Sequence, residues 1–284
     1  MELTPTLRCW LRLSRAPGIG SQKLIALLDT FSTPENILGA THTQLSKVLG
    51  DNETDLFAIS DEVDAERHAQ DIDWLAEEDS HLVSVADEAY PDLLREIPDP
   101  PALLYIKGDP VALSLPQLAI VGSRNPTPVG LENANAFAGA LASTGLVVTS
   151  GLALGIDTAA HRGALDGGGN TIAIAGTGVD RIYPARNHTV AHEIAKHGAL
   201  VSEFPLATPP LRENFPRRNR ILSGLSLGTL VVEAALRSGS LITARLAAEQ
   251  GREVFAIPGS IHSPQSRGCH QLIRQGAKLV ETAT

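Results

Sequence analysis

From residue 118 onward, short apolar runs alternate with longer stretches in which apolar residues recur at helical spacing. The runs contain few polar residues, which is typical of parallel strands that are buried on both faces. We predict seven strands of this kind, beginning at residues 118, 146, 171, 199, 229, 253 and 278. Helices are predicted between them, including residues 131–142, 188–197 and 241–250. This alternation predicts an α/β fold with an open, doubly wound, mostly parallel sheet.

The first 80 residues follow another pattern, in which the apolar spacing predicts only short helices. We expect these helices over residues 7–14, 22–30, 34–38, 45–49 and 64–78. The turn Ala16–Ser21, A-P-G-I-G-S, is similar to the hairpin of a helix-hairpin-helix unit. In such a hairpin, glycines let backbone N–H groups point at a nucleic-acid phosphate. A plain glycine turn inside a helical packing domain is an equally good interpretation.

A proline-rich connector separates these two patterns. It is flanked by two short β-like runs, His81–Val85 and Ala102–Ile106. We therefore predict a small helical domain over residues 1–80 and a sheet domain over residues 118–284. Residues 81–117 are expected to be a linker whose short strands join the sheet.

Charge is distributed unevenly along the 284 residues, whose net charge is −9. Residues 1–100 hold 20 acidic and 7 basic side chains, whereas residues 101–284 hold 12 acidic and 16 basic ones. The first part therefore carries −13 and the second +4. A basic second part fits contact with polyanions, although solubility alone would also explain the acidic first part.

Several classes of protein are disfavoured by what the sequence lacks. No apolar run approaches the roughly 18 residues of a membrane span, and two cysteines are too few for a disulfide framework. We therefore expect a cytoplasmic protein without a membrane partner. The histidines do not stand at ligand spacing beside the cysteines, so neither a metal nor a cofactor is expected. Motifs of P-loop ATPases, dinucleotide-binding turns and G-x-S-x-G hydrolases are also missing.

Small and polar residues follow the predicted strands, at the edge where α/β sheets bind ligands. Gly122, Ser123 and Arg124 follow the first strand, and Ser150 and Gly151 end the second. These residues offer backbone donors and a guanidinium to an anion. Thr127 is placed to cap the helix that comes next.

Three arginines gather in the stretch F-P-R-R-N-R over residues 215–220, with Asn219 among them. A helix that begins near Pro216 would hold Arg217, Arg218 and Arg220 at its positive end, which is unfavourable unless an anion lies there. Arginine suits phosphate because its planar fork donates two hydrogen bonds at once. Arg220 is expected to share a helix face with Arg217 rather than with Arg218. A structural ion-pair cluster is the alternative.

Three further residues are candidates for chemistry. Asp157 and His161 are four residues apart and are expected to share a helix face. Such a pair is more often a helix N-terminal acid and a structural histidine than a catalytic couple. Glu233, at a strand end, is a candidate general base or a cap for the helix that follows Ser238.

These motifs resemble the DNA-processing protein A family, also called DprA or Smf. The matches run in order through nearly all of residues 118–280. They include G-S-R at 122–124, S-G-L-A-L-G-I-D-T-A-A-H at 150–161, G-T-G-V-D-R-I-Y-P-A-R-N at 176–187, F-P-R-R-N-R-I-L-S-G-L-S at 215–226 and S-G-S-L-I-T-A-R-L-A at 238–247. His270 departs from the pattern, because an asparagine is expected there.

The resemblance implies an extended Rossmann-like domain preceded by a small helical domain of the SAM or helix-hairpin-helix type. It also implies a homodimer that is not an enzyme. Such a protein binds and protects incoming single-stranded DNA during natural transformation and loads the RecA recombinase onto it. The DNA or phosphate site would comprise Gly122, Ser123, Arg124, Thr127, Ser150, Gly151, Arg217, Arg218, Asn219, Arg220 and Ser240.

Two other classes stay open. One is a nucleotide or nucleotide-sugar hydrolase of the lysine-decarboxylase-like group. Gly228, Thr229 and Glu233 weakly resemble the motif P-G-G-x-G-T-x-x-E of that group, but the preceding L-S-L lacks the P-G-G. The other class is an adaptor that recruits a recombinase through its surface alone.

Overall fold

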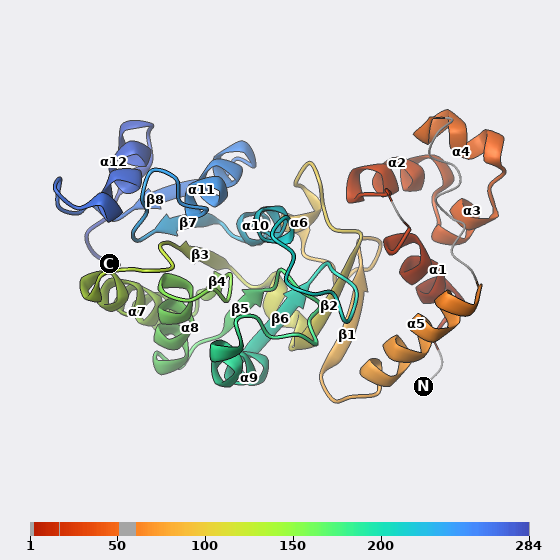
Figure 1. The fold of residues 1–284 in the computed structure, drawn as a ribbon, viewed down its shortest axis with the longest axis horizontal. Helices are drawn as coiled ribbons and strands as arrows, with labels where there is room; N and C mark the ends of the chain where they lie inside the picture. The colour runs from red at the N-terminus through yellow and green to blue at the C-terminus, as the bar shows by residue number, and fades with distance from the viewer. Residues whose placement is uncertain (1–2, 17, 51–60, 284) are drawn as a thin grey trace.

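A nine-stranded sheet forms the centre of the molecule (Figure 1), in the order β1-β2-β6-β5-β4-β3-β7-β8-β9. The computed structural model describes residues 3–16, 18–50 and 61–283, apart from the side chains of 61–64. β2 runs antiparallel to β1 and β6, and the other neighbouring strands are parallel. The strands are β1 (Ser80–Ser84), β2 (Leu103–Gly108), β3 (Gln117–Val121), β4 (Val147–Ser150), β5 (Thr171–Ile174), β6 (Gly198–Ser202), β7 (Gly228–Val231), β8 (Glu253–Ala256) and β9 (Lys278–Leu279). The predicted mostly parallel α/β fold is confirmed.

The chain winds outward from β3 in both directions, through β4 to β6 on one side and β7 to β9 on the other. β3 pairs in parallel with both β4 and β7, so their carboxyl ends lie together. The loops that leave β3 and β7 go to opposite faces of the sheet. This arrangement makes the β3–β7 boundary a topological switch point, where open α/β sheets bind ligands.

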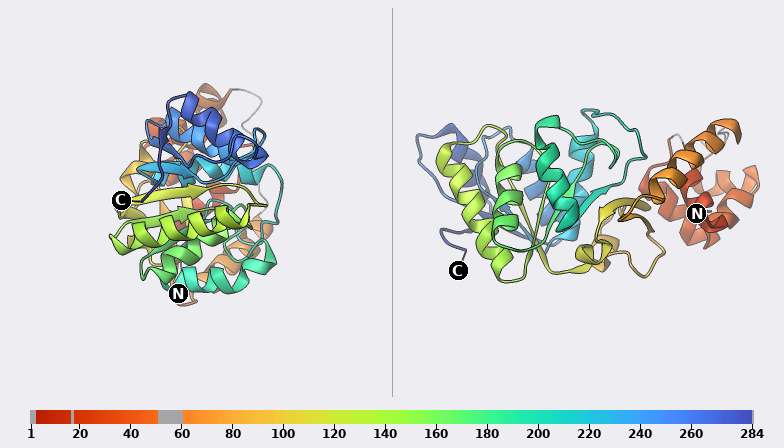
Figure 2. Two further views of the ribbon diagram at one scale, coloured as in Figure 1. Left: turned by 90° about the vertical axis from the view of Figure 1, so that its left-hand side faces the viewer. Right: turned by 90° about the horizontal axis from the view of Figure 1, so that it is seen from below.

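Helices cover both faces of the sheet, as the end-on view in Figure 2 shows. α7 (Pro128–Ser143), α8 (Ile156–Asp166) and α9 (His188–Lys196) lie on one face. On the other face lie α10 (Asn214–Leu225), α11 (Ser240–Glu249) and α12 (Arg267–Arg274). Alanines supply much of the apolar core under α7 and α8, whereas α10, α11 and α12 pack on a separate core. The small alanine side chains let α7 and α8 pack closely.

The helical domain extends from the β1 end of the sheet (Figure 2). Its helices are α1 (Pro5–Ser14), α2 (Ser21–Phe31), α3 (Pro34–Gly39), α4 (His42–Leu49) and α5 (Asp61–Leu75). All five predicted helices are present, although α5 ends three residues before the predicted end. The buried Arg15 and Asp71 form an ion pair, and the Trp74 ring lies 5.8 Å from that of Tyr105 on β2. One apolar cluster therefore continues from the helices into the sheet.

The connector over residues 81–117 does more than join two domains. β1 and β2 complete one edge of the sheet, and the connector also forms the short helix α6 (Asp92–Arg95). Its buried side chains Tyr90, Leu94 and Ile97 belong to the same apolar cluster as α10. The sheet domain consequently needs the connector for its core.

A truncation series tests this dependence. We expect residues 79–284 to unfold cooperatively, because the chain keeps every strand and the core residues of the connector. Residues 118–284 should be much less stable, since they lack β1, β2 and the buried Tyr90 and Leu94. Thermal unfolding followed by circular dichroism measures both. Equal midpoints and equal cooperativity for the two fragments would contradict the role given to the connector.

Candidate functional site

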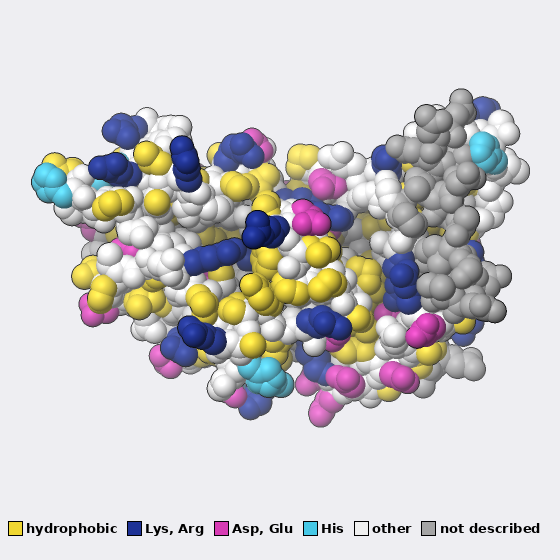
Figure 3. All heavy atoms as spheres, in the orientation of Figure 1, with side chains coloured by type: hydrophobic (Ala, Val, Ile, Leu, Met, Phe, Trp, Pro, Cys, Tyr) yellow, Lys and Arg dark blue, Asp and Glu magenta, His cyan; other side chains and the backbone are white. Residues whose placement is uncertain are grey.

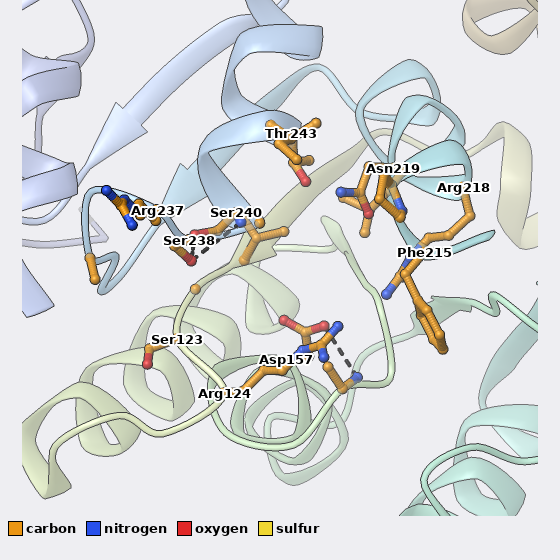
Figure 4. Close-up of a pocket in the computed structure, with 18 of the residues that line it drawn as sticks. Ser123, Arg124, Asp157, Phe215, Arg218, Asn219, Arg237, Ser238, Ser240 and Thr243 are labelled. Carbon is orange, nitrogen blue, oxygen red and sulfur yellow. Dashed lines mark hydrogen bonds between the residues drawn. The ribbon is translucent and has the colours of Figure 1, made fainter. Parts of the chain in front are cut away.

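A pocket of about 800 Å³ lies at the carboxyl ends of β3, β4 and β7, at the switch point of the sheet. Figure 4 shows its walls: the loop after β3 lies on one side, α10 on another, and the loop before α11 on a third. The sequence brings these segments together because each follows, or leads into, a strand of the same parallel sheet. The pocket is lined by Gly122, Ser123, Arg124, Asp157, Tyr183, Arg212, Phe215, Arg218, Asn219, Arg237, Ser238, Ser240 and Thr243, among others.

Positive charge dominates this pocket. Among the described residues that line it, four are arginines and Asp157 is the only acidic one. Figure 3 shows Lys and Arg side chains crossing the middle of the corresponding face of the molecule, among apolar ones. A concave surface with this excess of guanidinium groups concentrates anions.

Arg218 is the innermost of these arginines. Its side chain extends from α10 and is buried, and its Nη1 donates to the carbonyl oxygen of Ile174 at 2.6 Å. Burial lowers the pKa of Arg218 to about 10, an effect that the nearby Asp157 opposes. The guanidinium is therefore still charged at neutral pH.

Gly151 makes room for Arg218. A Cβ atom at residue 151 would lie 2.1 Å from Nη1 of Arg218, and guanidinium atoms surround that position. Only glycine permits this close approach at the end of β4. This packing explains why residue 151 is a glycine better than a direct contact with a ligand does.

Asp157 and His161 share the buried face of α8. Asp157 accepts a hydrogen bond from the Ala153 N–H at 3.2 Å, and burial raises its pKa. Nδ1 of His161 lies 2.7 Å from the Thr171 hydroxyl, and burial lowers the pKa of His161 to about 3. The interpretation as a helix N-terminal acid and a structural histidine is confirmed.

The N-terminal turn of α11 faces the pocket with Ser238, Ser240 and Thr243. The hydroxyls of Ser238 and Ser240 lie 2.7 Å apart. Backbone N–H groups in the first turn of a helix lack helical partners and carry partial positive charge. Together with Arg237, this turn places backbone N–H donors and a guanidinium on one wall of the pocket, an arrangement suited to an anion.

Two aromatic rings stand beside the arginines. The rings of Tyr183 and Phe215 lie 5.7 Å apart, and the Arg124 guanidinium lies 5.7 Å from the centre of the Phe215 ring. Tyr183 is 49% exposed, so much of this large apolar side chain faces solvent at the pocket. An exposed ring next to guanidinium groups provides a surface on which a nucleic-acid base can stack.

Thr127 supports the site without lining the pocket. Its hydroxyl accepts from the Gly130 N–H at 3.1 Å and so caps α7, as predicted. The Thr127 hydroxyl and N–H also donate to Glu233, at 2.6 and 2.9 Å. The prediction that Glu233 caps the helix after Ser238 is wrong, because its carboxylate holds the start of α7 instead. These two bonds also occupy the carboxylate that was a candidate general base.

Arg217 and Arg220 lie outside the pocket. They share a helix face, as predicted, but that face binds Glu203 at the end of β6. Arg220 donates to both carboxylate oxygens of Glu203, at 2.6 and 2.8 Å, and to the Asp99 carbonyl oxygen at 2.8 Å. The Arg217–Glu203 distance is 3.2 Å, and Arg217 is half exposed. Arg220 is thus a structural arginine, whereas a phosphate contact by Arg217 stays a prediction.

The predicted helix-hairpin-helix turn contacts this ion-pair cluster. The hydroxyl of the buried Ser21 accepts from Nη2 of Arg220 at 3.2 Å. Pro17 of the predicted turn lies outside the described residues. The turn therefore helps to join the helical domain to α10, and its contact with phosphate stays a prediction.

Six of the predicted site residues line the pocket. They are Gly122, Ser123, Arg124, Arg218, Asn219 and Ser240. Ser150 is buried below it, where its hydroxyl donates to the Ile120 carbonyl oxygen at 2.6 Å.

Helix α10 begins at Asn214 rather than near Pro216, which places Arg218 in its second turn. His270, where an asparagine was expected, lies 3.0 Å from the Gly259 carbonyl oxygen through Nε2.

Sequence reasoning missed several lining residues: Tyr183, Arg212, Phe215, Arg237 and Ser238. A detectable signal existed for two of them, because Arg237 and Ser238 directly precede a predicted helix after a strand end. The aromatic pair gave no such signal, since its members stand 32 positions apart in the sequence.

The fold and the pocket define a doubly wound α/β protein with an arginine-lined pocket at its switch point. The family model described as DNA recombination-mediator protein A matches residues 81–284. The chain belongs to this family, which is also known as DprA or Smf.

Curated relatives include protein Smf of Escherichia coli K12, which is 53% identical over 208 residues. That match covers 73% of this chain but only 56% of the relative's length. The DNA processing protein DprA of Streptococcus pneumoniae R6 is 49% identical over 197 residues, covering 69% of this chain and 70% of that protein.

Solved structures agree with this assignment. The X-ray structure of DprA from Streptococcus pneumoniae matches with a TM-score of 0.86 and 36% identity, covering 100% of this chain and 96% of that one. DprA from Helicobacter pylori, whose structure concerns its single-stranded DNA binding mode, matches with a TM-score of 0.65 and 34% identity. It covers 72% of this chain and 92% of that one.

Within residues 3–16, 18–50 and 61–283, no helix is long and apolar enough to span a membrane. Within the same ranges, no group of three or more His, Cys, Asp or Glu side chains is placed to hold a metal ion.

The buried His161 predicts a pH dependence of stability. Its pKa is about 3 in the folded chain and about 6.5 when unfolded, so the unfolded chain binds one more proton between these values. Stability should therefore fall as pH drops below 6.5, by about 1.4 kcal/mol per pH unit from this group. Chemical denaturation of the parent and of His161→Gln between pH 7 and 4.5 measures the slope. The free energy of unfolding should depend on pH less steeply in the variant, by the equivalent of about one proton. Identical slopes in the two proteins would contradict a neutral buried His161.

Proposed function

We propose that the protein binds single-stranded DNA in this pocket. The observation that carries the proposal is the convergence of four arginines and the α11 N-terminus at the switch point, beside two aromatic rings. Phosphates of the strand contact Arg124, Arg237 and the first turn of α11. Arg218 supplies a fixed positive charge below them.

The shape and lining of the pocket favour single strands over duplex. A single strand is flexible enough to enter a concave site, and its unpaired bases are free to stack on Tyr183 and Phe215. A duplex keeps its bases paired and exposes mainly its phosphates. Its rigid, convex backbone fits a concave pocket poorly. Binding is expected to depend little on sequence, because every base has a stacking face.

The family and its members support a role in DNA processing during natural transformation. The matching family is described as a recombination mediator, and relatives from Streptococcus pneumoniae and Bacillus subtilis are named DNA processing proteins. We infer that the chain protects incoming single strands in the cytoplasm and loads a RecA recombinase onto them. A homodimer that binds DNA without enzymatic turnover is part of the same proposal.

The hydrolase alternative gains no support from the geometry. Its motif would need a free Glu233, but this carboxylate accepts two hydrogen bonds from Thr127 at the start of α7. The adaptor alternative does not explain why a structure would gather four guanidinium groups around a pocket. Binding of single-stranded DNA accounts for the arginines and does not require a free Glu233.

Arg124→Ala tests the phosphate contact. Arg124 is exposed at the pocket, so its removal should weaken single-strand binding about tenfold or more and leave the unfolding midpoint unchanged. The dependence of affinity on salt should become shallower by roughly one phosphate contact. Fluorescence anisotropy with a labelled single strand, and with the blunt duplex of the same sequence, measures this at several salt concentrations.

Arg245→Ala is the matched control for this experiment. Arg245 is an exposed arginine of α11 that pairs with Glu249 and does not line the pocket. Its removal changes the net charge by the same amount, yet should leave affinity nearly unchanged. An equal loss in both variants would show that only overall charge matters, and equal affinity for duplex and single strand would also overturn the proposal.

Tyr183→Ala tests base stacking. Loss of an exposed ring should weaken single-strand binding by about 1–3 kcal/mol, without changing the salt dependence. Tyr183→Phe keeps the ring and should bind like the parent. The same anisotropy titrations measure both variants. A Tyr183→Ala variant with parental affinity, or a Tyr183→Phe variant as weak as Tyr183→Ala, would exclude stacking on this ring.

A further inference from the structure

Helix α9 carries two histidines one turn apart, His188 and His192. Both side chains are exposed, and their rings face each other with centroids 4.4 Å apart. The two Nε2 atoms lie 3.3 Å apart. Residues four apart lie on the same face of a helix, so the helix itself holds the two rings together.

The separation of the two nitrogens matches that of two ligands on one metal ion. Zinc binds imidazole nitrogen at about 2.0–2.1 Å with tetrahedral angles, which places two ligand nitrogens about 3.3–3.4 Å apart. The facing Nε2 atoms therefore need little movement to share a metal ion between them.

We propose that His188 and His192 form a chelating site for a divalent transition metal, of the class of Zn²⁺, Ni²⁺ and Cu²⁺. Imidazole suits this class, whereas Mg²⁺ and Ca²⁺ prefer oxygen ligands. The two nitrogens supply two coordination positions and water supplies the others, so the metal exchanges readily. Neither cysteine takes part, so the spacing of histidines relative to cysteines gives no sign of this pair.

The local backbone and charges are compatible with a bound cation. Asn187 fixes the start of α9, because its Nδ2 donates to the Leu152 carbonyl oxygen at 2.8 Å and to the Thr158 hydroxyl at 2.9 Å. A short 3₁₀ turn over Ala185–Asn187 precedes the helix, and the N–H of His188, the first residue of α9, donates to the Ala185 carbonyl oxygen in that turn. Glu193 lies next to His192 and pairs with Lys196 at 2.9 Å, which leaves little net charge there.

The site is separate from the proposed DNA pocket, because neither histidine lines that pocket. The inference therefore stands independently of the proposed function. Variants of His188 and His192 are expected to lose metal binding, whereas variants of Arg124 are expected to lose DNA binding.

Titration of the full chain with Zn²⁺, followed by calorimetry, tests the proposal. We expect one Zn²⁺ per chain at this site, and a rise in the unfolding midpoint with metal concentration. His188→Ala and His192→Ala should each weaken Zn²⁺ binding about tenfold or more, because each leaves a single imidazole without the benefit of chelation. With Cu²⁺, electron paramagnetic resonance of the parent should show two equivalent nitrogen ligands, and each variant should lose one.

His197→Ala is the matched control, because His197 is an exposed histidine at the end of the same helix. It should bind Zn²⁺ like the parent, and all variants should unfold at the parental midpoint without metal. Parental Zn²⁺ affinity in the double variant H188A/H192A would overturn the proposal. So would an equal loss in His197→Ala. A parent without measurable Zn²⁺ binding would likewise overturn it and leave the contact as a histidine–histidine hydrogen bond.

Discussion

The burial of a positive charge at the switch point is the constraint on which the rest of the site depends. Arg218 is held there by the carbonyl oxygen of Ile174 and by the space that Gly151 leaves. Burying an ion is costly unless other groups compensate it, and Asp157 provides part of the compensation. A bound phosphate would supply more. The charge that is costly to bury in the free protein would therefore favour binding of an anion in the proposed function.

A second arginine fixes the position of α10 above that charge. Arg220 binds Glu203, the Asp99 carbonyl oxygen and Ser21, which lie directly after β6, in the connector and in the helical domain respectively. These contacts set the rotation of α10 about its axis, and the rotation determines which arginine faces the pocket. Arg220 and Arg218 consequently have different roles. Arg220 stabilises the packing of three segments, whereas Arg218 contributes positive charge to the pocket.

Much of the fold followed from the sequence, because parallel strands buried on both faces leave continuous apolar runs. The loops at the strand ends were predictable for the same reason, and with them Arg124 and Ser240. Which of Arg217, Arg218 and Arg220 faces the pocket was not predictable. It depends on the rotation of α10 about its axis, and the ion pair with Glu203, distant in the sequence, sets that rotation. The meeting of Tyr183 with Phe215 likewise depends on how two loops pack together.

Hydrogen–deuterium exchange of the full chain, with and without a saturating single strand, tests the central claim most directly. If DNA lies in the pocket, backbone amides should gain protection in three separate segments, 122–127, 214–219 and 237–243. Residues of all three segments line the pocket at the switch point of the sheet. Protection confined to the helical domain or to α12, with no change in these three segments, would contradict the account.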